Sequence, residues 1–170
     1  MDKVYVEATY KSLNKLNEEL CGDRVEIVKN DDSYFVVLSD GLGSGVKANI
    51  LSTLTSKIIS TMMFQGASIE DTVETIVHTL PVCSVRKVAY STFMILQIDY
   101  DGNAYLVEFD SPGCIFVRDG RLMNIEYNYR SIAGKEIKEA HFKVKPNDFM
   151  MLLSDGVVYA GICLLYTSDA

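Results

Sequence analysis

The feature that most constrains the fold is a series of short apolar runs separated by turn-forming residues. Eight of these runs have the length and alternation typical of β-strands, and they cover residues 4–10, 24–29, 34–39, 91–100, 104–109, 114–118, 140–145 and 149–154. Several are joined by Asp101-Gly102, Pro112-Gly113 or Asp119-Gly120, the residue types that hairpin turns with positive φ require. Consecutive hairpins predict a largely antiparallel sheet.

Two amphipathic helices are predicted between these strands. The first spans Gly45–Phe64, where apolar residues recur at the spacing of one buried helix face. The second is capped by Ser68, with Asp71 three residues later, and ends at Pro81. The predicted inner faces are Val46, Ile50, Leu51, Leu54, Ile58, Ile59, Met62 and Met63 in the first helix, and Ile69, Val73, Ile76, Val77 and Leu80 in the second. The pattern predicts an α+β sandwich with helices packed on antiparallel sheet.

Size and charge limit the domain count and the partners. With 170 residues, 48% of them hydrophobic, the chain can bury one substantial core, and no repeat or linker divides it. Its net charge of −7 argues against nucleic acid or an anionic membrane as the main partner. No apolar run approaches the roughly 18 to 20 residues that span a bilayer, and Met1 does not begin a signal peptide. We expect a soluble, cytoplasmic protein.

The cysteines and histidines do not form a recognisable site. Cys21, Cys83, Cys114 and Cys163 lie far apart and include no CxxC pair, so we expect buried free thiols. His78 and His141 have no second histidine at ligand spacing. A histidine-based zinc site is therefore not expected.

The tetrapeptide Leu-Ser-Asp-Gly ends two separate apolar runs, at residues 38–41 and 153–156. A strand that ends in this way presents its carboxylate at the sheet edge, and the glycine lets the backbone turn and expose its carbonyl. If the two strand ends meet, Asp40 and Asp155 could share a cation, with Asp23 as a third acidic candidate. Carboxylates without histidine favour Mg²⁺ or Mn²⁺ acting on a phosphate or on water.

Simpler interpretations exist for these residues. Asp-Gly after a strand is usually only a turn, and Asp31 and Asp32 are most simply hairpin residues. The loop Gly41–Gly45 before the first helix could cradle a phosphate, although it lacks the GK[ST] ending of a P-loop. Arg24 could contact a phosphate beside Asp23, but an exposed arginine is more often solvated.

At these motifs the chain resembles a known family. LSDGLGSG before a long helix, CGDR upstream and LSDG after the later strands are similar to the bacterial SpoIIE-type serine/threonine phosphatases, a branch of the metal-dependent PP2C superfamily. The similarity runs from about Val4 to Ile162, and the family's fold, an α-β-β-α sandwich of antiparallel sheets flanked by helices, agrees with the strands and helices predicted above.

The resemblance also implies a site and a reaction. Asp40 would bridge two Mn²⁺ or Mg²⁺ ions, the Gly41 carbonyl would bind one of them and Asp155 the other. Asp23 would act through water or from outside the ligand shell. The implied reaction is hydrolysis of phosphoserine or phosphothreonine in a protein by a metal-activated water, without a phosphoenzyme. In the family the substrate is often a phosphorylated regulator of a sigma factor.

The chain departs from the family pattern at its C-terminus. Family members continue with a helix, a strand and a last acidic motif, whereas this sequence stops first, so the predicted sandwich is incomplete. The last eight residues, 163–170, resemble a translated sequencing-library adapter. We therefore expect a natural domain over residues 1–162 that extends further, and a chain that lacks one ligand and could be inactive.

Two rival functions stay open from the sequence. One is a non-catalytic module with the same sandwich, which would bind a phosphoprotein or a signalling partner. The other is a nucleotide-binding domain built on Gly41–Gly45. The acidic residues Asp23, Asp40 and Asp155 favour the enzyme over both.

Overall fold

The computed structural model describes residues 3–14, 19–79 and 91–158. Within these ranges lie nine strands and two helices. In chain order they are β1 (Asp23–Lys29), β2 (Ser33–Asp40), α1 (Gly45–Phe64), α2 (Ile69–Thr79), β3 (Thr92–Asp99), β4 (Asn103–Phe109), β5 (Cys114–Arg118), β6 (Arg121–Leu122), β7 (Asn128–Ile132), β8 (Lys135–Lys143) and β9 (Phe149–Leu152).

The strands form two antiparallel sheets, as predicted. The larger sheet has six strands in the order β1-β2-β3-β4-β8-β7, and the smaller has three in the order β6-β5-β9. Every neighbouring pair is antiparallel. The hairpin glycines Gly102 and Gly120 have φ of 82° and 71°, which confirms the turns expected at these positions.

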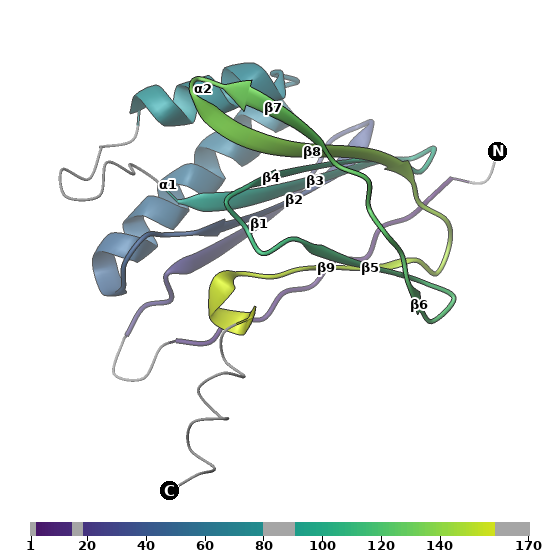
Figure 1. Ribbon diagram of the computed structural model, residues 1–170, viewed down its shortest axis with the longest axis horizontal. Helices are drawn as coiled ribbons and strands as arrows, with labels where there is room; N and C mark the ends of the chain where they lie inside the picture. The colour runs from purple at the N-terminus through teal and green to yellow at the C-terminus, as the bar shows by residue number, and fades with distance from the viewer. Residues whose placement is uncertain (1–2, 15–18, 80–90, 159–170) are drawn as a thin grey trace, which may run out of the picture.

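The sheets and helices are arranged in layers (Figure 1). Helices α1 and α2 cover one face of the six-stranded sheet, and the core between them includes Val37, Ile59, Ile76 and Ile95. The three-stranded sheet covers the opposite face, where Leu96 and Leu106 belong to a second core. The predicted α+β sandwich is therefore present as one helical layer and two sheets. Among the described segments, no helix is long and apolar enough to cross a membrane.

Helix α1 does not bury the apolar face that its sequence predicts. Val46, Ile50 and Leu54 are exposed, by 63%, 52% and 45%. The buried side contains Leu51, Ile59 and Met63, as expected, but its other members are small: Ala48, Ser52, Thr55, Ser56 and Ser60. Their hydroxyls are satisfied within the helix, for example by Thr55 Oγ1 donating to the Leu51 carbonyl at 2.8 Å, as is common for helical Ser and Thr. Small side chains let the helix approach the sheet closely.

Two of the strand predictions need correction. Residues 4–10 form no regular strand. The Val4 N–H donates to the carbonyl of Tyr100, in the turn after β3, at 2.8 Å. The alternation of the segment arises because Val4 and Val6 pack on the core between the sheets. The strand predicted at 140–145 begins earlier, at Lys135, and pairs with β7, which the sequence analysis did not predict. Strand β7 reads Asn-Tyr-Arg-Ser-Ile at the sheet edge, so it lacks the apolar alternation of an inner strand.

The start of α2 is confirmed. The Ser68 hydroxyl accepts a hydrogen bond from the Asp71 N–H at 3.1 Å and donates to the Asp71 carboxylate at 2.7 Å. This is the local bonding that the Ser-x-x-Asp pattern predicts. The predicted helix end at Leu80 and Pro81 lies outside the described residues.

An ion pair ties the small sheet to the loop before β9. Arg118 donates from Nε to Asp148 Oδ1 at 2.8 Å and from Nη2 to Oδ2 at 2.6 Å. It also donates to the Lys143 carbonyl at 2.8 Å, and the Lys145 N–H donates to the same Asp148 carboxylate at 2.7 Å. The side chain of Asp148 is only 5% exposed, so this pair is well shielded from water.

We expect Asp148→Asn to lower the free energy of unfolding by about 2 kcal/mol at pH 7, because it breaks charge-assisted hydrogen bonds. The Arg118 hydrogen bonds hold the pKa of Asp148 below its ordinary value. A lowered carboxylate pKa contributes stability above the unfolded pKa, and this is lost as pH falls through the folded one. Urea unfolding should therefore show a smaller difference in free energy of unfolding between the parent and Asp148→Asn at pH 3 than at pH 7. Asp31→Asn, in an exposed turn, is the control and should change neither value.

Candidate functional site

The three predicted acidic residues meet at one end of the sandwich. Strand β1 begins at Asp23 and β2 ends at Asp40, and the register places these two residues directly opposite each other. Asp155 follows β9 at the start of a short helical turn and lies near enough to act on the Asp40 carboxyl group. Two residues far apart in the sequence, Asp23 and Asp155, are thus gathered around Asp40.

The electrostatics of the group are those of crowded carboxylates. Burial, followed by the negative charge of Asp23 and by Asp155, raises the pKa of Asp40 from its ordinary 3.8 to about 8. Without a counter-charge, ionisation of Asp40 is therefore disfavoured. A divalent cation would remove the repulsion that contributes to this shift.

Close packing of α1 fixes the backbone beside these carboxylates. The Gly41 N–H donates to the Gly22 carbonyl at 3.0 Å, and Asn49 Nδ2 donates to the Cys21 carbonyl at 2.8 Å. A Cβ atom on Gly41 would lie 1.9 Å from the Ala48 carbonyl oxygen, and one on Gly22 would lie 3.3 Å from the Ala48 Cβ. The glycines of CGDR and LSDG therefore let the first turns of α1 reach the strand ends.

The serines of the two LSDG motifs have different surroundings. Ser154 is 6% exposed, and its hydroxyl donates to Asp23 Oδ2 at 2.7 Å. Ser39 shares a strand face with Val37, which packs beneath the helices, and its buried hydroxyl has no hydrogen-bond partner among the described residues. The sequence analysis missed the contact of Ser154, although the repeated tetrapeptide included it.

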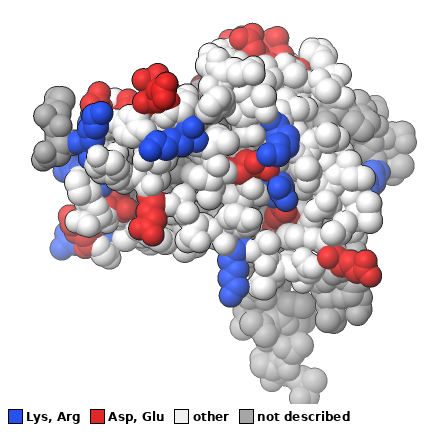
Figure 2. All heavy atoms as spheres, turned by 180° about the vertical axis from the view of Figure 1, so that it is seen from behind, with Lys and Arg blue, Asp and Glu red and all other residues white. Residues whose placement is uncertain are grey.

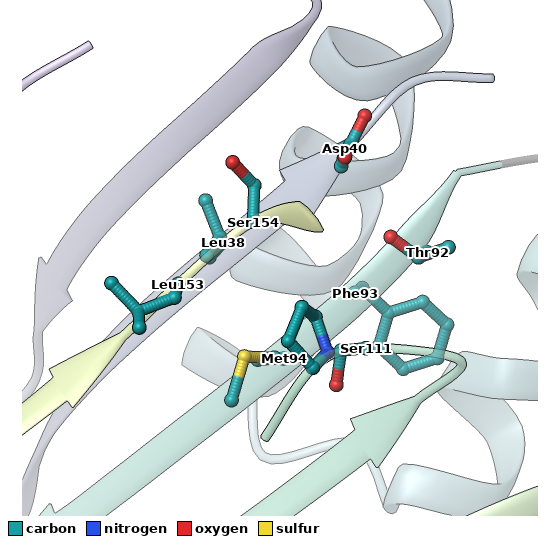
Figure 3. A pocket seen from close by; sticks show the side chains of 9 residues that line it. Leu38, Asp40, Thr92, Phe93, Met94, Ser111, Leu153 and Ser154 are labelled. Atoms are coloured by element: carbon teal, nitrogen blue, oxygen red, sulfur yellow. The ribbon is translucent and has the colours of Figure 1, made fainter. Parts of the chain in front are cut away.

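A small cavity lies beside the acidic group (Figure 3). Its volume is about 10 Å³, roughly the room needed for one water. Asp40 from β2, Thr92 from β3 and Ser154 line it, and Figure 3 shows their side chains around the end of the larger sheet. Leu38, Met94 and Leu153 form its apolar wall.

The other candidates of the sequence analysis lie apart from this group. Arg24 alternates with Asp23 along β1, so its side chain leaves from the opposite face of the sheet. There its Nε donates to Glu26 at 3.2 Å, and Lys57 of α1 donates to the same carboxylate at 2.7 Å. Arg24 is therefore engaged in an ion-pair cluster with Glu26 and Lys57, at the edge of the sheet face that α1 covers. Cys21 and Cys114 are free thiols, and Cys83 and Cys163 lie outside the described residues.

The Gly41–Gly45 loop makes the transition from β2 to α1. Gly43 and Gly45 have φ of 107° and 65°, conformations that glycine adopts readily. Ser44 is the N-cap residue of α1, and its side chain makes no cap hydrogen bond. Binding of a phosphate by this loop stays a prediction.

The residues at this end of the sandwich suit a divalent cation in donor type. The donors are three carboxylates and a backbone carbonyl, which hard cations such as Mg²⁺ and Mn²⁺ prefer. Burial and the neighbouring carboxylates raise the pKa of Asp40, and a bound cation would supply the counter-charge that its ionised form lacks. In their present positions, however, no three acidic, histidine or cysteine side chains among the described residues are placed to hold one ion.

Comparison with known proteins gives a consistent family and fold. The sequence model of the family described as Stage II sporulation protein E (SpoIIE) matches residues 30–161. No curated protein matches the chain. The solved structures with the same fold include the PP2C phosphatase domain, with a fragment of the regulatory domain, of the cell fate determinant SpoIIE from Bacillus subtilis, at TM-score 0.73 and 21% identity.

Two further structures share the fold. RsbX in complex with magnesium has a TM-score of 0.66 at 20% identity. The RsbU and RsbW domains of a Mycobacterium tuberculosis protein have a TM-score of 0.70 at 16% identity. The three alignments cover 86%, 85% and 86% of this chain, but 44%, 71% and 42% of the other chains. This chain therefore spans less than half of the SpoIIE structure that includes a fragment of the regulatory domain.

Proposed function

This chain belongs to the SpoIIE family, and we propose that it is a metal-dependent phosphatase that hydrolyses phosphoserine and phosphothreonine in a protein substrate. The observation that carries the proposal is the convergence of Asp23, Asp40 and Asp155 at one end of the sandwich. Such a group does not favour stability, because burial and the neighbouring carboxylates raise the pKa of Asp40 and oppose folding. A costly acidic cluster of this kind is more readily explained by function.

The proposed roles follow from the position of each residue. Asp40, next to the other two carboxyl groups, would help to hold two Mg²⁺ or Mn²⁺ ions, the Gly41 carbonyl would bind one of them and Asp155 the other, and waters would supply further ligands. Asp23 would hold the site from the side of β1. The ions, when bound, would supply a water of lowered pKa and neutralise charge on the phosphoryl group. Magnesium in the RsbX structure supports this choice of cation.

The proposed substrate is a phosphorylated protein, and the proposed location is the cytoplasm. The free thiols of Cys21 and Cys114 suit a reducing compartment. On the face shown in Figure 2, acidic and basic side chains lie side by side, so this face has no large area of one sign. We propose that regulators of sigma factors are the first substrates to test.

The proposal is tested by Mn²⁺-dependent hydrolysis of p-nitrophenyl phosphate. We expect Asp155→Asn to lower the rate by about 100-fold or more, because loss of even an outer-sphere partner typically costs 10- to 100-fold. Asp155 is exposed, so the fold should be unaffected. The assay should use this chain and the longest reading frame that contains residues 1–162. Asp31→Asn is the matched control and should keep full activity.

A non-catalytic module that binds a phosphoprotein is the second candidate. It is favoured by one observation, the lack of a closed set of three metal ligands among the described residues. A folded protein that binds Mn²⁺ but releases no phosphate from p-nitrophenyl phosphate or from a phosphopeptide would support this module and contradict the phosphatase.

A further inference from the structure

We propose that Ser154 is a positioning residue: its hydroxyl holds the Asp23 carboxylate toward Asp40 and Asp155, and thereby sets the affinity of this site for a divalent cation. The inference rests on the metal-binding part of the proposed function. It assigns a role to the serine of the second LSDG motif. The sequence alone cannot distinguish this serine from that of the first motif, because the two tetrapeptides are identical.

The contact itself joins the two sheets. Ser154 lies just after β9 of the smaller sheet, and Asp23 begins β1 at the edge of the larger one. The hydrogen bond from Ser154 Oγ to Asp23 Oδ2 is 2.7 Å long and connects residues 131 positions apart. Because Ser154 is buried, water competes poorly for this bond, and a carboxylate acceptor makes it stronger than a bond between neutral groups.

Asp23 needs such a contact because its neighbour across the sheet is a second carboxyl group. Asp23 and Asp40 face each other across β1 and β2, and they repel whenever both are ionised, as they must be to hold a cation. Repulsion alone would favour rotation of the Asp23 side chain toward solvent. A donor held on the other sheet opposes this rotation and keeps Asp23 in contact with Ser154. Ser154 in turn lines the cavity together with Asp40 and Thr92 (Figure 3).

The simpler role for a serine at this position would be to cap the helical turn that begins at Asp155. A capping hydroxyl accepts a hydrogen bond from a backbone N–H two or three residues later. Here the Val157 N–H donates to the Ser154 backbone carbonyl at 3.2 Å, whereas the hydroxyl donates to Asp23. The side chain is directed to the acidic group and not to the helix end.

Ser39 provides an internal control for the inference. It precedes Asp40 as Ser154 precedes Asp155, and it is likewise buried. Its side chain lies on the helix-covered face of β2, and its hydroxyl has no partner among the described residues. Loss of the Ser39 hydroxyl should therefore leave the acidic residues in place.

The test is calorimetric titration of the full chain with Mn²⁺, on samples shown to be folded by circular dichroism. We expect Ser154→Ala to raise the Mn²⁺ dissociation constant by about 10- to 100-fold, the usual effect of losing a group that orients a ligand. Ser154→Thr keeps a hydroxyl, so its Mn²⁺ dissociation constant should stay within about threefold of that of the parent. Ser39→Ala should stay within about twofold of the parent. If Ser154→Ala does not fold, Ser154→Cys replaces it in the test. The thiol is a weaker donor of similar size, so this variant should also bind Mn²⁺ more weakly than the parent.

A double-mutant cycle shows whether Ser154 acts through Asp23. In an Asp23→Ala background, Ser154→Ala should cause no further loss of Mn²⁺ affinity. The inference is overturned if folded Ser154→Ala binds Mn²⁺ as tightly as the parent, if Ser39→Ala weakens binding equally, or if the parent binds no Mn²⁺. Phosphate release from the same samples separates the two proposals. If Ser154→Ala weakens Mn²⁺ binding but the parent releases no phosphate, the positioning role is supported and the phosphatase is contradicted. If the parent releases phosphate but Ser154→Ala binds Mn²⁺ as tightly as the parent, the phosphatase is supported and the positioning role is contradicted.

Discussion

Gly41→Ala is expected to lower the free energy of unfolding by about 3 kcal/mol or more and to abolish Mn²⁺-dependent hydrolysis. The added Cβ would lie 1.9 Å from the carbonyl oxygen and 2.6 Å from the carbonyl carbon of Ala48. These are backbone atoms of α1, so no side chain can rotate away, and the first turns of the helix must move. The helix covers the strand ends that carry Asp23 and Asp40, so its displacement should disturb the acidic group. Urea unfolding and the phosphatase assay measure the two effects.

Two other glycines provide matched controls. The Cβ of Gly156→Ala would lie 3.9 Å from its nearest neighbour, Ser154 Oγ, an ordinary contact, so stability should change little. The Cβ of Gly22→Ala would lie 3.3 Å from the Ala48 Cβ, a side-chain atom. Adding Ala48→Gly removes that side-chain atom, so it should recover the stability lost in Gly22→Ala, once the usual cost of a glycine in a helix is subtracted. It should recover none of the stability lost in Gly41→Ala, where the clash is with backbone atoms. Rescue of Gly41→Ala by Ala48→Gly, or full stability of Gly41→Ala, would contradict this account.

Asp40→Asn should have opposite effects on activity and stability. We expect the rate of Mn²⁺-dependent hydrolysis to fall by at least about 100-fold, because a proposed metal-binding carboxylate is lost. The metal-free protein should become more stable, because the substitution removes a carboxylate crowded by Asp23 and Asp155. Asp40 is partly exposed, and water screens much of this repulsion, so we expect a gain of about 1 to 2 kcal/mol. That corresponds to a rise in Tm of roughly 2 to 8 °C.

The gain should depend on pH in a defined direction. The pKa of Asp40 is raised from 3.8 to about 8 in the folded protein, so between these values the folded state binds more protons than the unfolded state. The contribution of Asp40 to the free energy of unfolding of the metal-free parent therefore falls as pH rises through this range. The side-chain amide that Asp40→Asn introduces cannot ionise, so the difference between variant and parent should be small near pH 4 and largest above pH 8. Thermal unfolding in the presence of a chelator measures it.

Mn²⁺ should reverse the order of stability of the parent and Asp40→Asn. A ligand that binds only the folded state raises Tm by mass action, so saturating Mn²⁺ should stabilise the parent and have little effect on Asp40→Asn. Asp31→Asn, in the exposed turn after β1, should behave like the parent throughout. A stability difference between Asp40→Asn and the metal-free parent that does not grow between pH 5 and pH 8 would show that Asp40 is not the crowded group described above.

Much of the sheet could be predicted because its signals are local. Hairpin residues such as Asp119 and Gly120 have positive φ in the structure, and those conformations depend on a few neighbouring atoms. The failures arose where packing overrides the local pattern. Residues 4–10 alternate like a strand without pairing as one, and β7 lacks apolar alternation because it lies at a sheet edge.

The convergence of the acidic residues was also predictable in part. The repeated LSDG motif located Asp40 and Asp155, and the hairpin between β1 and β2 placed Asp23 near Asp40. Arg24, adjacent to Asp23 in sequence, could not be assigned to a side of the sheet without a register. In the structure it pairs with Glu26 on the face that α1 covers, because successive side chains of a strand leave from opposite faces.

The sequence by itself determined the strand ends, the turn glycines and the residue types of the acidic group, because these depend on local backbone preference and side-chain chemistry. Only the tertiary structure decided what each LSDG motif does. Ser39 is buried beneath the helices, whereas Ser154 reaches across from the smaller sheet to Asp23. The two tetrapeptides are identical, so the difference comes from which sheet holds each strand and which face each serine takes. Both depend on contacts between residues far apart in the sequence, 131 positions in the case of Ser154 and Asp23.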